Sequence, residues 1–184
     1  MTTFPAELTG TWDIDPAHST VGFAARHAVV ATTRGHFTEF TGGATIDAEH
    51  PETSSAWLEI DVASVTTGNA DRDVHLKGAD FFNAEAHPKI TYKSTGAKLD
   101  GDNLVLTGDL TIAGTSHPVE VTWEFGGVIK DPWGNLKGGF EGSATLNRKD
   151  WGLVWNAVLE TGGVMVSDKI KLVLEIEAAR KPEA

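Results

Sequence analysis

Apolar and polar residues alternate along most of this chain. Residues 119–125 read Val-Glu-Val-Thr-Trp-Glu-Phe, and residues 104–112 carry leucine or isoleucine at 104, 106, 110 and 112. Successive side chains of a β-strand point to opposite faces, so this period of two predicts a sheet with one polar and one apolar face. The same alternation predicts further strands at 12–14, 21–27, 35–48, 58–62, 90–94, 140–146 and 170–176.

Three stretches depart from the alternation. Residues 69–78 predict a short helix with Asn69 as its N-cap. Asp80 is expected to cap a second helical turn that ends before Pro88. Residues 152–165 follow neither period, and a pair of glycines in this segment favours a loop.

An apolar sheet face must be buried, and a chain made mostly of strands buries it by curling onto itself. We therefore predict an all-β fold, an antiparallel β-barrel of about eight strands with one or two short helices. The 184 residues fit one domain over 1–184. Segments 1–9 and 179–184 are expected to be frayed tails.

Composition excludes several classes of function. Fifteen basic against 26 acidic residues leave a formal net charge of −11, which is unsuited to binding nucleic acid. No apolar run approaches the ~20 residues that cross a bilayer, so no stable membrane insertion is expected. Residues 1–10 lack the basic and apolar regions of a secretion signal, so we expect a cytoplasmic protein. Cysteine is absent, which removes disulfides and thiolate metal sites.

Seven histidines raise the question of a metal or catalytic site. His18, His27 and His36 are best placed to converge, but no close spacing such as His-x-His occurs. We therefore predict no metal site and no cofactor. Ser116 and His117 adjoin in a turn without a nucleophile-elbow glycine pattern, so no catalytic residue is assigned.

Two histidines have an alternative role in ligand binding. His27 shares the inward parity of its strand, where it is either a satisfied core residue or a ligand contact. His75 lies one helical turn after Asp71, so a local ion pair is the simplest interpretation. The alternative is that Arg72 and His75 present cationic donors to the head group of a ligand.

The aromatic residues lie mostly on the apolar parity or at strand ends. An eight-stranded barrel is either packed solid or has room for one ligand. Small inward residues favour a cavity; they are Ala25, Ala44, Ala48, Ser94, Gly108 and Ala144.

A set of segments, in this order and spacing, matches a known family. They are Trp12-Asp13-Ile14-Asp15-Pro16-Ala17-His18-Ser19, Phe23 to His27, Gly35-His36-Phe37, Ser64-Val65-Thr66-Thr67, Arg72-Asp73-Val74-His75-Leu76, Asp80-Phe81-Phe82, His87-Pro88-Lys89-Ile90, Gly108 to Gly114 and Arg148-Lys149-Asp150-Trp151-Gly152-Leu153. In these segments the chain resembles the YceI-like family of polyisoprenoid-binding proteins. The resemblance implies a lipocalin-like barrel with an elongated tunnel for an isoprenoid chain or a similar amphiphile.

Together these observations favour a protein that is not an enzyme and that binds, stores or transports an amphiphilic lipid, such as a polyisoprenoid or an isoprenoid quinone. The expected ligand contacts are Phe23, His27, Phe37, Phe40, Leu58, Ile60, Arg72, His75, Phe81, Phe82, Tyr92, Leu110, Trp123, Phe125 and Phe140. One rival is an isomerase or hydrolase that acts on an isoprenoid-like substrate with His27 or His75 as its base. The other is a stress or interaction protein without a ligand. A homodimer through an exposed edge strand is left open.

Overall fold

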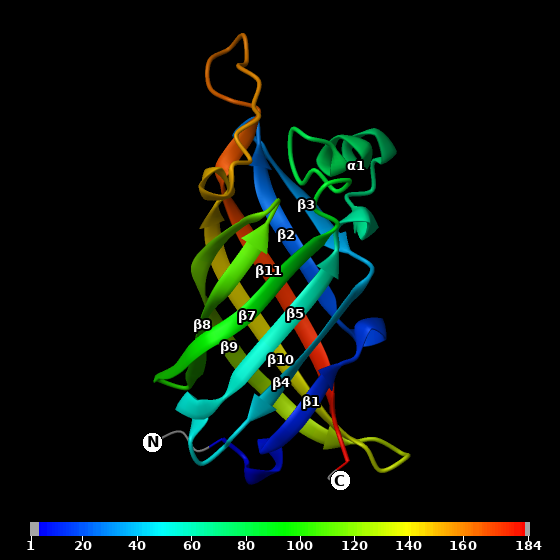
Figure 1. Cartoon of the computed structure of the whole chain (residues 1–184), viewed down its shortest axis with the longest axis vertical. Helices are drawn as coiled ribbons and strands as arrows, with labels where there is room; N and C mark the ends of the chain where they lie inside the picture. The colour runs from blue at the N-terminus through cyan, green and yellow to red at the C-terminus, as the bar shows by residue number, and fades with distance from the viewer. Residues whose placement is uncertain (1–3, 183–184) are drawn as a thin grey trace.

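In the computed structural model, which describes residues 4–182, the chain is built almost entirely from antiparallel strands (Figure 1). The strands are β1 (Gly10–Ile14), β2 (Thr20–His27), β3 (Ala31–Phe37), β4 (Phe40–Ile46), β5 (Ser55–Asp61), β6 (Val65–Thr66), β7 (Lys89–Asp100), β8 (Asn103–Ile112), β9 (Thr115–Lys130), β10 (Leu136–Asn147) and β11 (Val166–Arg180). The helices are α1 (Ala70–Lys77) and the short 3₁₀ helices η1 (Ala6–Leu8), η2 (Pro16–His18), η3 (Pro51–Thr53), η4 (Val62–Ser64) and η5 (Arg148–Trp151).

The strands close into a barrel. The hydrogen-bonded order is β1-β4-β5-β7-β8-β9-β10-β11, and β1 pairs back with β11 to complete the ring. The predicted antiparallel, lipocalin-like barrel of about eight strands is therefore confirmed. Closure gives the apolar sheet face an enclosed interior, because a ring of strands has no open edge.

One strand holds the closure together. The last residues of β11 pair with β1 (Trp12 opposite Arg180), while its earlier part pairs with β2 (Leu172 opposite Phe23). From Lys169 to Ala179, β11 also pairs with β10. The strands β2, β3 and β6 thus extend the wall beyond β1, toward the end of the barrel where α1 lies (Figure 1).

The predicted helix is present as α1. The side-chain oxygen of Asn69 accepts a hydrogen bond from the backbone N–H of Arg72 at 3.0 Å, as expected of an N-cap. Residues 78–86 form consecutive turns in place of the second helical turn. The carboxylate of Asp80 lies 2.9 Å from the ring of His75, so it binds a side chain of α1 instead of capping a helix.

The expected tails lie partly outside the described residues, which begin at residue 4 and end at residue 182. Within the described part, Leu8 is 1% exposed and β11 continues through Arg180, so ordered structure extends further at both ends than composition indicates. Residues 152–165 form an irregular loop with a single bridge between Val158 and Val164. No helix in residues 4–182 is long and apolar enough to span a membrane.

Candidate functional site

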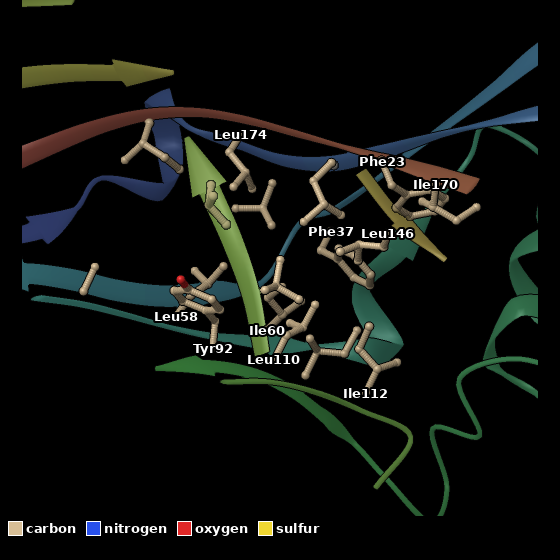
Figure 2. Close-up of a pocket in the computed structure, with 18 of the residues that line it drawn as sticks. Phe23, Phe37, Leu58, Ile60, Tyr92, Leu110, Ile112, Leu146, Ile170 and Leu174 are labelled. Atoms are coloured by element: carbon tan, nitrogen blue, oxygen red, sulfur yellow. The ribbon is translucent and has the colours of Figure 1, made fainter. Parts of the chain in front are cut away.

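The barrel encloses a cavity of about 570 Å³. Side chains from every strand of the closed ring line it, and almost all of the lining is apolar. Figure 2 shows Leu174 and Ile170 on one wall and Leu58 and Tyr92 on the opposite wall, with the side chains pointing inward. A cavity of this size is within the range that holds small-molecule ligands.

Exposure of the inward-facing residues agrees with an unfilled interior. Leu58, Tyr92, Trp123 and Leu172 lie on the inward parity of their strands, yet they are only partly buried. In a solidly packed core such side chains make contacts on all sides. Their remaining accessible surface therefore faces the cavity, which contradicts the solid barrel considered as an alternative.

Nearly all expected ligand contacts lie along this cavity. The expected residues that line it are Phe23, His27, Phe37, Leu58, Ile60, Arg72, His75, Phe81, Phe82, Tyr92, Leu110, Trp123, Phe125 and Phe140. Phe40 does not line it; this side chain is buried in the surrounding apolar core.

Aromatic side chains close the end of the cavity opposite α1. Trp12 is 1% exposed, its indole N–H donates to the carbonyl of Leu8 at 2.8 Å, and its ring packs edge-on against Phe140. Phe125 connects Phe140 to Phe4, with ring centroids 5.7 and 6.3 Å apart. The hydrocarbon tail of a ligand that enters the barrel therefore ends against these aromatic rings, which form the floor of the cavity.

Polar side chains gather at the α1 end. Arg72 donates from Nε to the Thr67 hydroxyl at 2.7 Å and from Nη2 to the Thr67 carbonyl at 2.9 Å. Asp73 accepts from the hydroxyl and N–H of the same threonine, and these hydrogen bonds lower the pKa of its carboxyl. Arg26 and His27 line the same end from β2 and are exposed. Because lining residues here reach solvent, this end is the mouth of the cavity.

His75 joins α1 to the loop across the mouth. Its ring contacts Phe81 and Trp155 edge-on, with centroids 5.0 and 4.6 Å apart. Its Nε2 lies 2.9 Å from a carboxylate oxygen of Asp80. The expected pairing with Asp71 is thus replaced by a hydrogen bond with Asp80, because the turn after α1 returns toward the helix.

Arg148 is a cavity residue that was not among the expected ligand contacts. It is 5% exposed, and its guanidinium donates to the carbonyls of Ser167, Leu153 and Trp155 at 2.9, 2.6 and 2.9 Å. Burial lowers its pKa, and the nearby carboxylate of Asp168 opposes that effect. The guanidinium therefore fastens the loop that follows η5 to the start of β11.

Other lining residues come from η5, the 152–165 loop and β11. Trp151, Leu153, Trp155 and Met165 lie in η5 and the 152–165 loop. On β11 the lining residues are Val166, Ile170, Leu172, Leu174, Ile176 and Ala178. The alternation of β11 was a usable signal for these positions, whereas the loop offered none.

Few polar groups lie in the middle of the cavity. The Tyr92 hydroxyl donates to the Leu106 carbonyl at 3.1 Å, and burial raises its pKa to about 12, so it stays protonated. The indole N–H of Trp123 is buried and has no acceptor within residues 4–182. Trp123 lies close to β10, where a Cβ at Gly142 would be 2.7 Å from its ring. The middle of the cavity thus offers an apolar environment.

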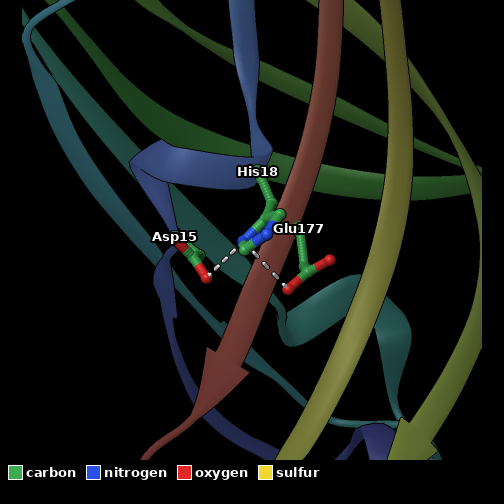
Figure 3. A group of neighbouring side chains, drawn as sticks. All are labelled: Asp15, His18 and Glu177. Atoms are coloured by element: carbon green, nitrogen blue, oxygen red, sulfur yellow. Dashed lines mark hydrogen bonds and ion pairs between the residues drawn. The ribbon is translucent and has the colours of Figure 1, made fainter.

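A separate charged cluster lies where β1 diverges from β11 (Figure 3). His18 Nδ1 is 3.1 Å from Asp15 and 3.8 Å from Glu177. Lys137 Nζ also lies 3.0 Å from Asp15 and 3.5 Å from Glu177. Asp15, His18 and Glu177 are residue types that bind metal ions, but the ammonium group of Lys137 already neutralises the two carboxylates. We assign the cluster as an ion-pair network, and His27 and His36 take no part in it.

Asp15 makes the stability of the barrel depend on pH in the acidic range. The hydrogen bond from His18, followed by that from Lys137, lowers the pKa of Asp15 from 3.8 to about 2. A carboxyl whose pKa is lower in the folded state stabilises the fold above about pH 4, and this contribution is lost as the pH falls toward 2. We expect Asp15→Asn to cost ~1–2 kcal/mol at neutral pH, allowing for solvent screening.

Urea unfolding at several pH values would measure this effect. The variant should lose less stability than the parent protein between pH 4 and pH 2. Asp13→Asn is the matched control, since Asp13 makes one exposed ion pair with Lys181 at 3.2 Å. Parallel pH curves for Asp15→Asn and the parent protein would contradict this assignment.

Fold and cavity together define a lipocalin-like barrel with an enclosed apolar site. The model of the YceI-like domain matches residues 12–178. UPF0312 proteins from Pseudomonas aeruginosa and Photorhabdus laumondii are 35% and 36% identical to the chain; in both, the match covers 92% of this chain and 85% of the relative. The chain belongs to the YceI-like family.

Solved structures share the fold. A Campylobacter jejuni YceI protein superimposes with a TM-score of 0.73 at 31% identity, over 85% of this chain and 90% of that one. BcnA of Burkholderia cenocepacia reaches a TM-score of 0.78 at 24% identity, over 89% and 98%. A polyisoprenoid binding domain from Saccharophagus degradans shares the fold at 13% identity, with a TM-score of 0.61 over 92% and 98%.

Proposed function

We propose that this protein binds an amphiphilic lipid and acts as its carrier or store. The observation that carries this proposal is the apolar cavity, with an aromatic floor at one end and a polar mouth at the other. The hydrocarbon tail lies among residues such as Leu58, Leu110 and Leu172, and the head group lies near Arg72 and His75.

The length of the cavity favours a long tail. On β11 the lining extends from Ile170 to Ala178, which is about 26 Å along the strand at ~3.3 Å per residue. One leaflet of a bilayer is only about 15 Å thick in its hydrocarbon part. A polyisoprenoid or an isoprenoid quinone fits this description better than a short acyl chain.

Burial of the tail provides affinity but little selectivity. Each methylene removed from water contributes ~0.8 kcal/mol, so one five-carbon isoprene unit contributes up to about 4 kcal/mol. A bilayer offers the same tail a similar apolar environment. Selection of one lipid therefore depends on the shape of the cavity and on polar contacts at its mouth.

Groups at the mouth favour a head group with oxygen acceptors. Two nitrogens of Arg72 bind Thr67, and its third, Nη1, has no acceptor in the described part of the chain. His27 also lines the mouth, from the end of β2. A phosphate or a carbonyl oxygen suits donors of this kind.

Extraction of the protein purified from its native host, followed by mass spectrometry, tests the proposal. One lipid class in a near-stoichiometric amount is the expected result. Adding that lipid at one hundred times its dissociation constant should stabilise the emptied protein by about 2.7 kcal/mol, which raises Tm by roughly 5–10 °C. Unselective traces of lipid together with an unchanged Tm would contradict a carrier.

A second candidate is an enzyme that uses the same cavity. The pairing of His75 with Asp80 favours it, since a carboxylate next to an imidazole is a common arrangement in general bases. The extracted lipid, incubated with the protein, distinguishes the two functions. Turnover that is lost in His75→Ala while lipid binding persists supports the enzyme, and no turnover in either protein supports the carrier.

Two expectations stay predictions. They are the cytoplasmic location and a homodimer. The related UPF0312 proteins carry no activity in their names, so the proposal depends on the geometry of the cavity.

A further inference from the structure

Exposed valines are concentrated beside the mouth of the cavity. Of the ten large apolar side chains that are exposed in residues 4–182, five lie in the β2–β3 turn and in the 152–165 loop. Val30 is 83% exposed and Val158 is 85% exposed. We call this set the mouth rim; it consists of Val29, Val30, Val154, Val158 and Val164.

The two segments of the mouth rim are held side by side. The N–H of Ala28 donates to the carbonyl of Met165 at 2.8 Å, and His27 pairs with Val166. The loop projects beyond the barrel at the end where α1 lies (Figure 1). His27, Trp155 and Met165, which belong to these segments or adjoin them, also line the cavity, so the mouth rim is continuous with the ligand site.

The β2–β3 turn presents its valines at a conformational cost. Ala28 and Val29 have φ angles of 49° and 65°, and the N–H of Val30 donates to the carbonyl of His27, as in a type I′ turn. This turn favours Asn and Gly, and a β-branched residue with positive φ is an outlier. Exposure of Val29 to water adds a second cost. Neither is needed for a hairpin, so both indicate a role for the exposed side chains.

Charge indicates the kind of surface that the mouth rim contacts. Glu160 is the only charged residue between 152 and 165, in a chain with 22% charged residues. Arg26 on β2 donates to Val29 in the turn and to Thr32 on β3, so its guanidinium is engaged within the hairpin. With a net charge of −11 and no basic cluster among these segments, attraction to an anionic membrane is not expected.

We propose that the mouth rim docks reversibly on a neutral lipid bilayer, where the ligand passes between membrane and cavity. This inference rests on the proposed function. Each methylene in a lipid tail lowers the concentration of free lipid in water about fourfold. Transfer of a long-tailed lipid through water is therefore extremely slow. Valines inserted around the mouth remove that step. Apolar side chains at a water interface bind bilayers in this way without spanning them.

Co-sedimentation with phosphatidylcholine vesicles tests the docking surface. We expect the full-length protein to bind, with little change on adding salt and no gain on adding phosphatidylglycerol. Replacing Val30, Val154 and Val158 together with serine should lower the vesicle partition coefficient at least about tenfold. The matched control is Ile129→Ser with Trp133→Ser, two exposed apolar residues outside the mouth rim, which should leave binding within about twofold.

The strained turn provides a second variant. Ala28→Asn with Val29→Gly introduces the preferred type I′ residues, so Tm should rise while vesicle binding falls. A merely structural role for this turn predicts that vesicle binding is unchanged when Tm rises. That result would overturn the docking proposal.

A lipid delivered without membranes separates docking from lipid binding. Geranylgeraniol added from ethanol should raise Tm equally in the parent protein and in the mouth-rim variants. If the parent protein binds this probe but not vesicles, the docking proposal fails and the carrier remains. If it binds neither, both fail. If mass measurements show a dimer that the serine variant dissociates, the mouth rim contacts a second copy, and docking on a bilayer is overturned.

Discussion

Replacing Leu172 with tryptophan is expected to lower the affinity for the lipid at least about tenfold while the barrel still folds. Leu172 lines the cavity, is partly buried, and pairs with Phe23 on β2 and with Ala144 on β10. The small side chain of Ala144 leaves space for an indole. If the tryptophan occupies the volume of one isoprene unit, the loss of up to about 4 kcal/mol corresponds to a roughly thousandfold weaker complex.

Titration of the co-purifying lipid into the emptied protein measures this change. Lys171→Trp is the matched control, because Lys171 is exposed and precedes Leu172 on the same strand. Its affinity should equal that of the parent protein. Unchanged affinity in Leu172→Trp, with a Tm close to that of the control, would mean that the lipid binds outside the barrel.

Arg148→Met is expected to destabilise the protein by about 3–5 kcal/mol, or roughly 10 °C in Tm. The guanidinium is buried and donates to four carbonyls of the chain between Leu153 and Ser167. Methionine fills similar space but leaves those acceptors without donors in a buried environment. Arg148→Lys should recover little, because one ammonium cannot reach carbonyls arranged around a planar fork.

Thermal unfolding and hydrogen exchange measure the two parts of this effect. Exchange should accelerate first in the 152–165 loop and at the start of β11. Lys149→Met is the control, since Lys149 makes a half-exposed ion pair with Asp168 at 3.1 Å and should cost less than about 1 kcal/mol. Equal losses in the two variants would show that Arg148 contributes only as a surface charge.

The barrel and its inward-facing residues could be predicted because the signal is local. Alternation on β9 identifies Trp123 and Phe125 as inward without knowledge of any partner strand. The helix start at Asn69 is equally local. Phe40 shares the apolar character of the lining residues but packs in the core beside the cavity. Parity alone cannot distinguish these two environments.

The rest of the site depends on contacts between distant segments. Arg148 stands beside Lys149 and Asp150 in the sequence, where it resembles an exposed charge. Its burial results from the loop that returns over it. Trp155 likewise meets His75 only because that loop crosses the mouth. The pairing of Trp12 with Arg180 also cannot be predicted from local sequence pattern, because the register between these distant strands is set when the barrel closes.

The position of β11 has a consequence for biosynthesis. This strand binds β1, β2 and β10, yet it is translated after all of them. Translation proceeds at ~5–20 residues per second, so several seconds pass between synthesis of β10 and completion of β11. During this time the sheet is open and its apolar face is exposed to water. Joining residues as far apart as Trp12 and Arg180 is also intrinsically slow. The barrel therefore closes only after β11 has left the ribosome, and chaperone binding to the open sheet is expected to last until then.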